Sequence, residues 1–229
     1  MHDLRHLCLE LNLNIPKERL ALFTWGNVSV RADDNIFIKP SGVPFEELTK
    51  AQISEVEIST GKVLSGLKPS VDTNIHIEIY KSDADVRSVI HTHSPYATMF
   101  SQAKKMIPLI GTTHADYFPC DIPVTEEFSF NPKANDMETL MGRAVVDCAK
   151  QSYPVGTHAK AVLMASHGVM LWSSNPKKII EYSIVLEEIA KLALGSLQLN
   201  PNHKPTEKDK KMFDFHYQRK HGKERYYGQ

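Results

Sequence analysis

The chain has 229 residues, enough to bury one substantial hydrophobic core, and we expect a single domain spanning residues 1–229. Its 27 basic and 27 acidic residues cancel, so it has no bulk attraction for nucleic acid or an anionic membrane. We therefore expect neither as a partner, and any anionic substrate must be held by a local site.

The cysteines and the N-terminus indicate a cellular compartment. Cys8, Cys120 and Cys148 are odd in number and contain no CxxC pair, which argues against a disulfide framework and favours a reducing compartment. Charged residues occupy the N-terminus where a secretory signal would be apolar, and no apolar run approaches the length of a membrane span. These features predict a cytoplasmic protein.

Five segments combine helical spacing of apolar residues with helix-end signals. Ser94 and Pro95 open one as N-cap and first residue, Asn175 and Pro176 open another, and Pro16 marks the end of the first. We predict helices over residues 1–14, 72–82, 94–103, 136–152 and 176–199.

Alternating or continuous apolar runs predict the strands. These cover residues 28–32, 35–40, 53–60, 61–66, 87–93 and 160–168. Residues 53–66 form a hairpin around Thr60-Gly61, and residues 40–53 hold a turn and a short helix. The polar stretch 200–211 is a linker or an exposed turn before a basic, aromatic tail. Because strands and helices interleave, we expect a layered α/β or α+β domain.

The sequence Ile90-His91-Thr92-His93 ends an apolar run, and it predicts a metal site. Residues i and i+2 of a strand point to the same face, so the two imidazoles lie side by side. Neutral imidazole suits zinc, copper, iron or nickel, and His167 can supply a third ligand. Two structural, hydrogen-bonded histidines are the competing interpretation, and spacing alone leaves the two balanced. Three ligands with an open position are typical of a catalytic metal, which acts as a Lewis acid or activates water.

Three polar turns could bind phosphate. They are Thr24-Trp25-Gly26-Asn27, Lys39-Pro40-Ser41-Gly42 and residues 68–73. Such loops can aim backbone N–H groups at an anion, and Lys39 adds a positive charge. Each is weak evidence by itself, because the same dipeptides are common in ordinary turns.

Seven motifs together resemble a known family. They are TWGNVS, IKPSG, KPSVDT, VIHTH, GTTHADYF, SHG and the terminal RKHG…YYGQ. Their order is similar to that of the L-ribulose-5-phosphate 4-epimerases of the class II aldolase/epimerase superfamily, from about residue 20 to the last residue. The resemblance implies a central, mostly antiparallel β-sheet flanked by helices.

The resemblance also implies roles for individual residues. One zinc ion per subunit would be held by Asp72, His91, His93 and His167. The substrate phosphate would be bound by Gly26, Asn27, Ser41, Gly42, Ser70 and Val71, with Lys39 nearby. The catalytic residues would be Asp116, Tyr227 and His216, where His216 assists Asp116. Family members are cyclic homotetramers in which a neighbouring subunit supplies Asp116 and Tyr227, so the tail 205–229 would contribute to the active site.

The implied reaction interconverts L-ribulose 5-phosphate and D-xylulose 5-phosphate. Because the C4 hydrogen is not acidic, the family inverts C4 by zinc-assisted retro-aldol cleavage and re-addition, which needs two acid/bases. This phosphosugar pair fits arabinose or ascorbate breakdown. A class II aldolase that splits a ketose 1-phosphate such as fuculose phosphate is the alternative, and a non-catalytic sugar-phosphate binder is disfavoured because it would not need Asp116.

Val71 departs from the family pattern, which usually has a second serine at this position. A hydroxyl hydrogen bond to phosphate contributes about 1.5–3 kcal/mol. We expect weaker phosphate binding or a slightly different substrate, and the KM of a Val71→Ser variant measures this effect.

Overall fold

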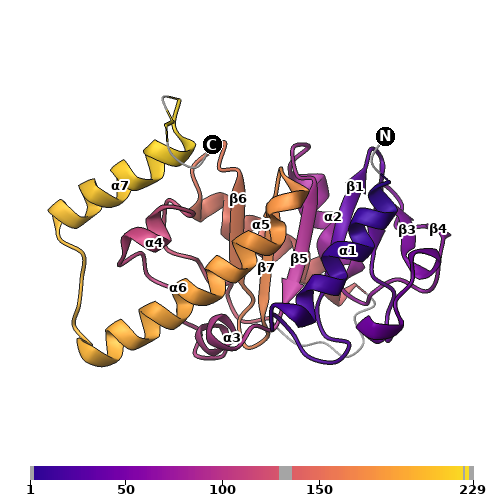
Figure 1. The fold of residues 1–229 in the computed structure, drawn as a ribbon, viewed down its shortest axis with the longest axis horizontal. Coiled ribbons are helices and arrows are strands. Elements are labelled where there is room, and N and C mark those ends of the chain that lie inside the picture. Colours follow the sequence, from indigo (N-terminus) through magenta and orange to yellow (C-terminus); the bar gives the residue numbers. More distant parts are fainter. Residues whose placement is uncertain (1–2, 129–135, 224, 227–229) are drawn as a thin grey trace.

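The computed structural model describes residues 3–128, 136–223 and 225–226, and one seven-stranded sheet forms its centre (Figure 1). The strand order is β4-β3-β2-β1-β5-β7-β6, and every pairing is antiparallel. The strands are β1 Asn27–Ala32, β2 Asn35–Ile38, β3 Ser54–Glu57, β4 Val63–Ser65, β5 Ser88–Thr92, β6 Ala159–Leu163 and β7 Val169–Ser173. The predicted layered fold with an antiparallel sheet is confirmed.

Helices cover both faces of this sheet. The α-helices are α1 Leu4–Lys17, α2 Thr73–Ser82, α3 Pro95–Gln102, α4 Thr112–Ala115, α5 Met137–Ser152, α6 Ile179–Leu199 and α7 Glu207–His221. Short 3-10 helices are η1 Phe45–Glu47, η2 Lys50–Gln52 and η3 Pro176–Lys178. Helices α4 and α7 lie together at one end of the molecule, whereas β3 and β4 lie at the other (Figure 1). In the described ranges, no helix is both long and apolar enough to cross a membrane.

Strand β1 is hydrogen-bonded to helices of both layers. On one side, the Asn12 side chain of α1 accepts a hydrogen bond from the Val28 N–H (2.8 Å) and donates one to the Val28 carbonyl (3.0 Å). On the other side, the Ser29 hydroxyl contacts His76 of α2 at 2.7 Å. Both layers are therefore held to the same central strand.

The predicted strand over residues 160–168 is wrong beyond Leu163. The chain turns there, with a Met164 N–H to Gly168 carbonyl hydrogen bond of 2.8 Å, and returns as β7, which the sequence did not predict. Ser166 adopts a positive φ of 62° in this turn. His167 therefore lies in the hairpin turn and not at a strand end.

One helix extends further than predicted, and two helices, α4 and α7, were not predicted. Residues 207–211 belong to α7 and not to a linker, because Thr206 and Asp209 form a capping box. Helix α1 continues past Pro16, where a proline in the last turn removes only one backbone hydrogen bond. The short helix α4 was not predicted, because four residues carry no periodicity.

The start of helix α3, directly after the paired histidines, is held by a residue far away in the sequence. Ser94 occupies the predicted N-cap position, but its side chain makes no capping hydrogen bond. The Glu187 carboxylate of α6 accepts instead from the Tyr96 N–H (2.8 Å) and the Ala97 N–H (3.0 Å). A carboxylate at a helix N-terminus is stabilising for both hydrogen bonding and the helix dipole.

We expect Glu187→Ala to lower the free energy of unfolding by about 1–2 kcal/mol, because it leaves two N–H groups without their acceptor. Glu187→Gln keeps an acceptor and should cost less. Urea unfolding of both variants measures the effect. The matched control is Glu188→Ala, which removes an exposed carboxylate 3.9 Å from Lys191 and should change stability little. Equal losses for Glu187→Ala and Glu188→Ala would contradict the proposed cap.

Candidate active site and metal centre

Three histidines from two segments form the metal-ligand cluster of the site. His91 and His93 come from the end of β5, and His167 comes from the β6–β7 turn. One ligand atom from each lies within 4.8 Å of the others. The Nε2 atom of His91 is 2.9 Å from that of His93 and 3.2 Å from that of His167. The structure thus brings together the three predicted histidine ligands.

The tautomer of His91 is suited to metal binding. Its Nδ1 lies 2.9 Å from the Val169 carbonyl, which can only accept, so Nδ1 carries the proton and Nε2 presents a lone pair. Burial, followed by repulsion from the other two imidazoles, lowers the pKa of His93 to about 4. Burial and then His91 also lower the pKa of His167. Both remain neutral near pH 7, which is the form that ligates a metal.

The spacing of the three nitrogens fits a tetrahedral ion. Nitrogens bound to zinc at 2.0–2.1 Å with tetrahedral angles are about 3.3 Å apart, close to the two separations of 2.9 and 3.2 Å that involve His91 Nε2, and all three ligand atoms lie within 4.8 Å of one another. The residues present therefore fit a zinc-type site with three imidazole ligands.

Two glycines allow the backbone to approach this cluster. Gly26 has a positive φ of 73°, and a Cβ there would lie 2.7 Å from the His91 carbonyl oxygen. At Gly168, a Cβ would lie 2.7 Å from the Thr92 carbonyl oxygen and 3.2 Å from the His91 ring. Any side chain at either position would displace the strand end that carries the histidines.

Asp72, the fourth predicted metal ligand, lies beside the cluster but outside it. It occupies the N-cap position of α2, and its Oδ2 accepts hydrogen bonds from Asn27 Nδ2 (2.7 Å) and Ser70 Oγ (3.2 Å). Burial opposes ionisation, but His91, His76 and the Asn27 hydrogen bond outweigh it and lower the pKa of Asp72. An ionised carboxylate therefore lies next to the three imidazoles.

One cavity of about 330 Å³ contains most of the predicted binding residues. Its lining includes the three histidines and Asp72, together with Gly26, Asn27, Lys39, Ser41, Gly42, Ser70 and Val71. Two of the polar turns predicted to bind phosphate are joined by hydrogen bonds here: the Ser41 N–H donates to the Lys68 carbonyl (3.0 Å), and the Ser70 N–H donates to the Lys39 carbonyl (3.1 Å). Those two amides are already engaged, so the Gly42 and Val71 amides and the Ser41 hydroxyl are the better candidates for binding an anion.

Lys39 supplies the positive charge among the residues that line this cavity, and its relative exposure is only 2%. Its ammonium lies 3.4 Å from the Thr24 carbonyl and 4.8 Å from the centre of the Phe45 ring. Among the residues that the structure describes, no carboxylate forms a salt bridge with it. Burial lowers the pKa of Lys39 to about 8. A buried ammonium of this kind favours an incoming anion.

Two exposed apolar side chains, Val71 and Trp25, line this cavity and are 65% and 51% exposed. Phe23, which is 74% exposed, packs against Trp25 with ring centres 5.6 Å apart. The Trp25 ring lies 6.0 Å from the His93 ring. An exposed apolar group of this kind is typical of a surface that contacts another molecule.

The predicted catalytic pair Asp116 and His216 meets where α4 packs against α7. His216 Nδ1 lies 3.1 Å from Asp116 Oδ1. Arg219 also donates to both carboxylate oxygens, at 3.1 and 3.2 Å, and His221 Nε2 donates to the Asp116 backbone carbonyl at 2.9 Å. The carboxylate is therefore held in a fixed orientation by several donors.

Sequence reasoning missed Arg219 and His221. Arg219 follows His216 at the i, i+3 spacing, which places these two on one face of a helix, whereas His221 reaches Asp116 from the last residue of α7 and its spacing gives no such signal. Without the helix, whose start is marked by the capping box at Thr206, that spacing had no meaning. Tyr227, the other predicted acid/base, lies outside the described residues.

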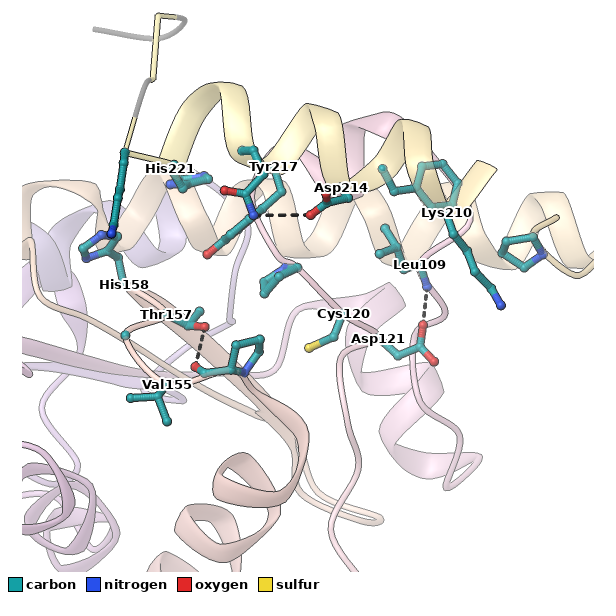
Figure 2. Close-up of a pocket in the computed structure, with 18 residues that line it drawn as sticks. Leu109, Cys120, Asp121, Val155, Thr157, His158, Lys210, Asp214, Tyr217 and His221 are labelled. Atoms are coloured by element: carbon teal, nitrogen blue, oxygen red, sulfur yellow. Dashed lines mark hydrogen bonds between the residues drawn. The ribbon is translucent and has the colours of Figure 1, made fainter. Parts of the chain in front are cut away.

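The Asp116 group and the histidine cavity are separate within one chain. No described residue of α4 or α7 lines the cavity with the histidines. A second cavity, of about 780 Å³, lies between α7 and the loops at residues 119–121 and 154–158 (Figure 2). Figure 2 shows His158, Tyr217 and His221 around it, and none of the predicted site residues lines it. We therefore assign the candidate site to the smaller cavity.

Comparisons with solved structures agree with this fold. The chain is similar to an L-fuculose 1-phosphate aldolase, with a TM-score of 0.79, 20% identity, and coverage of 95% of this chain and 97% of that one. It is also similar to YgbL of Escherichia coli, a putative aldolase/epimerase/decarboxylase, with a TM-score of 0.71, 21% identity, and coverage of 92% and 97%. Identities this low show the shared fold alone.

Sequence comparison extends the likeness over the whole chain. The chain is 37% identical over 233 residues to the probable L-ribulose-5-phosphate 4-epimerase UlaF of Mycoplasma pneumoniae. This alignment covers 100% of this chain and 96% of the relative. The family model of the class II aldolase and adducin N-terminal domain matches residues 6–194. The chain therefore belongs to the class II aldolase and adducin N-terminal domain family.

Proposed function

We propose that this protein is a metal-dependent sugar-phosphate epimerase that interconverts L-ribulose 5-phosphate and D-xylulose 5-phosphate at C4. The observation that carries the proposal is that a single cavity is lined both by the three-histidine cluster and by the Lys39 and serine loops. That combination suits a substrate with metal-binding oxygens at one end and a phosphate at the other. The full-length likeness to a probable epimerase of this substrate supports it.

His91, His93 and His167 would hold one zinc ion per subunit, with Asp72 as the adjacent acidic residue. When bound, the ion supplies Lewis-acid stabilisation of negative charge that develops on the substrate. The neutral imidazoles and the ionised carboxylate are the donor set that such an ion needs.

The phosphate would lie on the Gly42 and Val71 amides, the Ser41 hydroxyl and Lys39. A phosphate dianion there restores the charged form of Lys39, which burial otherwise disfavours. Holding the phosphate also keeps the two-carbon fragment in the cavity after the C3–C4 bond breaks, so that its aldehyde can turn before the bond re-forms on the opposite face.

Asp116 would move the proton of the C4 hydroxyl oxygen on one face, and Tyr227 would do so on the other. His216 and Arg219 hold the Asp116 carboxylate through its oxygens, which fixes the direction in which it can accept a proton. Two acid/bases on opposite faces are what an inversion at C4 requires.

We further propose a homotetramer in which a neighbouring copy supplies Asp116, and Tyr227 from the tail 205–229, to the cavity. Asp116 does not line the cavity of its own chain, and exposed Trp25 in the cavity lining, with Phe23 packed against it, suits coverage by another subunit. The whole chain would work as one domain. A cytoplasmic location is consistent with the three free cysteines, Cys8, Cys120 and Cys148.

The zinc-loaded protein should convert L-ribulose 5-phosphate into D-xylulose 5-phosphate in an NMR time course, and a chelator should abolish the reaction. Asp116→Asn should lower kcat about 10²–10⁴-fold, because the general base is lost. His203→Asn, which changes a histidine in the loop before α7, is the matched control and should be fully active. Cleavage of a ketose 1-phosphate with no epimerisation would support the aldolase alternative instead.

Phosphate binding should weaken above pH 8, because Lys39 loses its proton there. One pH unit above a pKa of about 8, only about one tenth of Lys39 remains charged, so the affinity for inorganic phosphate at pH 9 should fall about tenfold relative to pH 7. Calorimetric titration at several pH values measures this. Lys39→Met should bind phosphate weakly at every pH; an unchanged alkaline loss in that variant would assign the effect to another group.

Mixing two inactive variants should restore activity if sites form between subunits. Asp116→Asn protomers keep the histidine cluster, and His167→Asn protomers keep Asp116, so a mixed assembly regains some complete sites. Random mixing of equal amounts should restore up to about one quarter of wild-type activity. Co-expression with two different tags, followed by purification on both, provides the mixed sample. No recovery in verified hybrids would mean that each chain builds its site alone.

A further inference from the structure

Trp25 differs from the other side chains that line the cavity with the histidines. Apart from the three histidines, it is the only aromatic residue among the described residues of the lining, most of which are small, polar or charged. Its side chain is 51% exposed, although burial stabilises a large apolar ring. A half-exposed indole in a polar cavity indicates a surface that contacts what the cavity binds.

The Trp25 ring is held next to the histidine cluster. Its centre lies 6.0 Å from the centre of the His93 ring. Phe23 packs against it edge-on, with ring centres 5.6 Å apart and an interplanar angle of 80°. The Trp25 N–H donates to the Leu22 carbonyl at 2.9 Å, so its backbone belongs to a tight turn. Both the turn and the aromatic neighbour therefore set where the indole lies.

The turn that carries Trp25 contacts both halves of the cavity. The carbonyl of the preceding residue, Thr24, lies 3.4 Å from the Lys39 ammonium in the phosphate half. The backbone of the following residue, Gly26, lies so close to the His91 carbonyl that a Cβ would be 2.7 Å from its oxygen. Trp25 thus borders the histidine end of the cavity from a turn that is anchored at both ends.

Water competes with the productive step of the proposed reaction. When the C3–C4 bond breaks, the electron pair stays on C3 of the three-carbon fragment as an enediolate, and the C4 hydroxyl proton passes to the enzyme base. Attack of C3 on the opposite face of the aldehyde then gives the epimer. If water protonates C3 instead, the base returns its proton to solvent, and dihydroxyacetone and glycolaldehyde phosphate are released. Exclusion of water from the cleaved substrate decides between these outcomes.

We propose that Trp25 is a specificity-determining residue, whose ring covers the histidine end of the cavity and keeps water from the cleaved substrate. The carbon atoms of the indole offer water no hydrogen bond, so the ring displaces solvent that a polar side chain would hold. With the ring in place, the enediolate re-adds to the aldehyde and the enzyme is an epimerase. Without it, protonation by water turns the same cleavage into an aldolase reaction. This inference rests on the proposed function.

Product analysis by NMR tests the proposal. Zinc-loaded wild-type protein should convert L-ribulose 5-phosphate into D-xylulose 5-phosphate with little dihydroxyacetone. Trp25→Ala should raise the ratio of dihydroxyacetone to D-xylulose 5-phosphate about tenfold, and Trp25→Phe, which keeps a smaller ring, should lie between the two. In D2O, the dihydroxyacetone should carry a carbon-bound deuterium from solvent. Phe23→Ala is the matched control, because it removes an exposed ring of the same turn that does not line the cavity, and its ratio should stay within about twofold of wild type.

Acrylamide quenching of fluorescence measures the exposure of Trp25 without turnover. The chain has two tryptophans, and Trp172 is only 4% exposed, so acrylamide should quench mainly Trp25. Glycolaldehyde phosphate, added to the zinc-loaded protein, should reduce this quenching about twofold or more, because it fills the cavity beside the ring. In Trp25→Phe, the remaining emission should not respond to it.

Several results would overturn the inference. They are an unchanged product ratio in Trp25→Ala, an equal rise in Phe23→Ala, and quenching that glycolaldehyde phosphate does not alter. Size-exclusion chromatography and chelator competition identify the other roles: lost assembly or lost zinc affinity with an unchanged product ratio would make Trp25 a subunit contact or a support for His93. If Trp25→Ala does not fold, Trp25→Phe and the quenching measurement decide.

Failure of this inference can be distinguished from failure of the proposed function. If the wild-type protein epimerises its substrate and the Trp25 variants give the same product ratio, only the role of Trp25 is wrong. If the wild-type protein does not epimerise L-ribulose 5-phosphate, the proposed function fails, and the inference fails with it.

Discussion

The site depends on the position of β5 between β1 and β7. Its pairing places His91 opposite Asn27 on one side and opposite Met170 on the other. The strand therefore ends in the middle of the sheet, where the β6–β7 turn brings in His167 and the Val169 carbonyl fixes the His91 tautomer. Two glycines, Gly26 and Gly168, let the neighbouring backbone close around this strand end. A metal centre built this way is as rigid as the sheet that carries it.

Asn27 and Ser70 connect the two halves of the cavity. Asn27 Nδ2 donates to Ser70 Oγ in the phosphate loop and to Asp72 Oδ2 beside the histidines. The metal half and the phosphate half are therefore set at a fixed separation by direct hydrogen bonds and not by a flexible linker. The proposed reaction breaks and re-forms a bond between the part of the substrate at the histidines and the part at the phosphate-binding turns. A fixed separation between the two halves of the cavity keeps the two fragments aligned for re-addition.

The Asp116 group, proposed as an acid/base, is held mainly by a helix and not by the sheet. Asp116 lies at the end of a four-residue helix, and donors from one long helix, α7, hold its carboxylate. This unit lies at the end of the molecule formed by α4 and α7, away from β3 and β4 (Figure 1). The histidine cluster and the Asp116 group are thus built on separate parts of the fold.

Sequence alone determined the interleaved layers, most strands and helices, the HxH pair on one face of β5, and the loops around Gly26 and Ser41. All of these depend on local signals: periodicity, caps and turn residues. It did not determine the β6–β7 turn, because the predicted strand over residues 160–168 continued through the positive φ of Ser166, and it did not predict helix α7, whose first residues it assigned to a linker or exposed turn. Tertiary structure alone decided that Glu187 caps α3 and that Arg219 holds Asp116. Those contacts join residues that are distant in the chain or on different elements, and their geometry exists only once β1, β5 and the helices have packed.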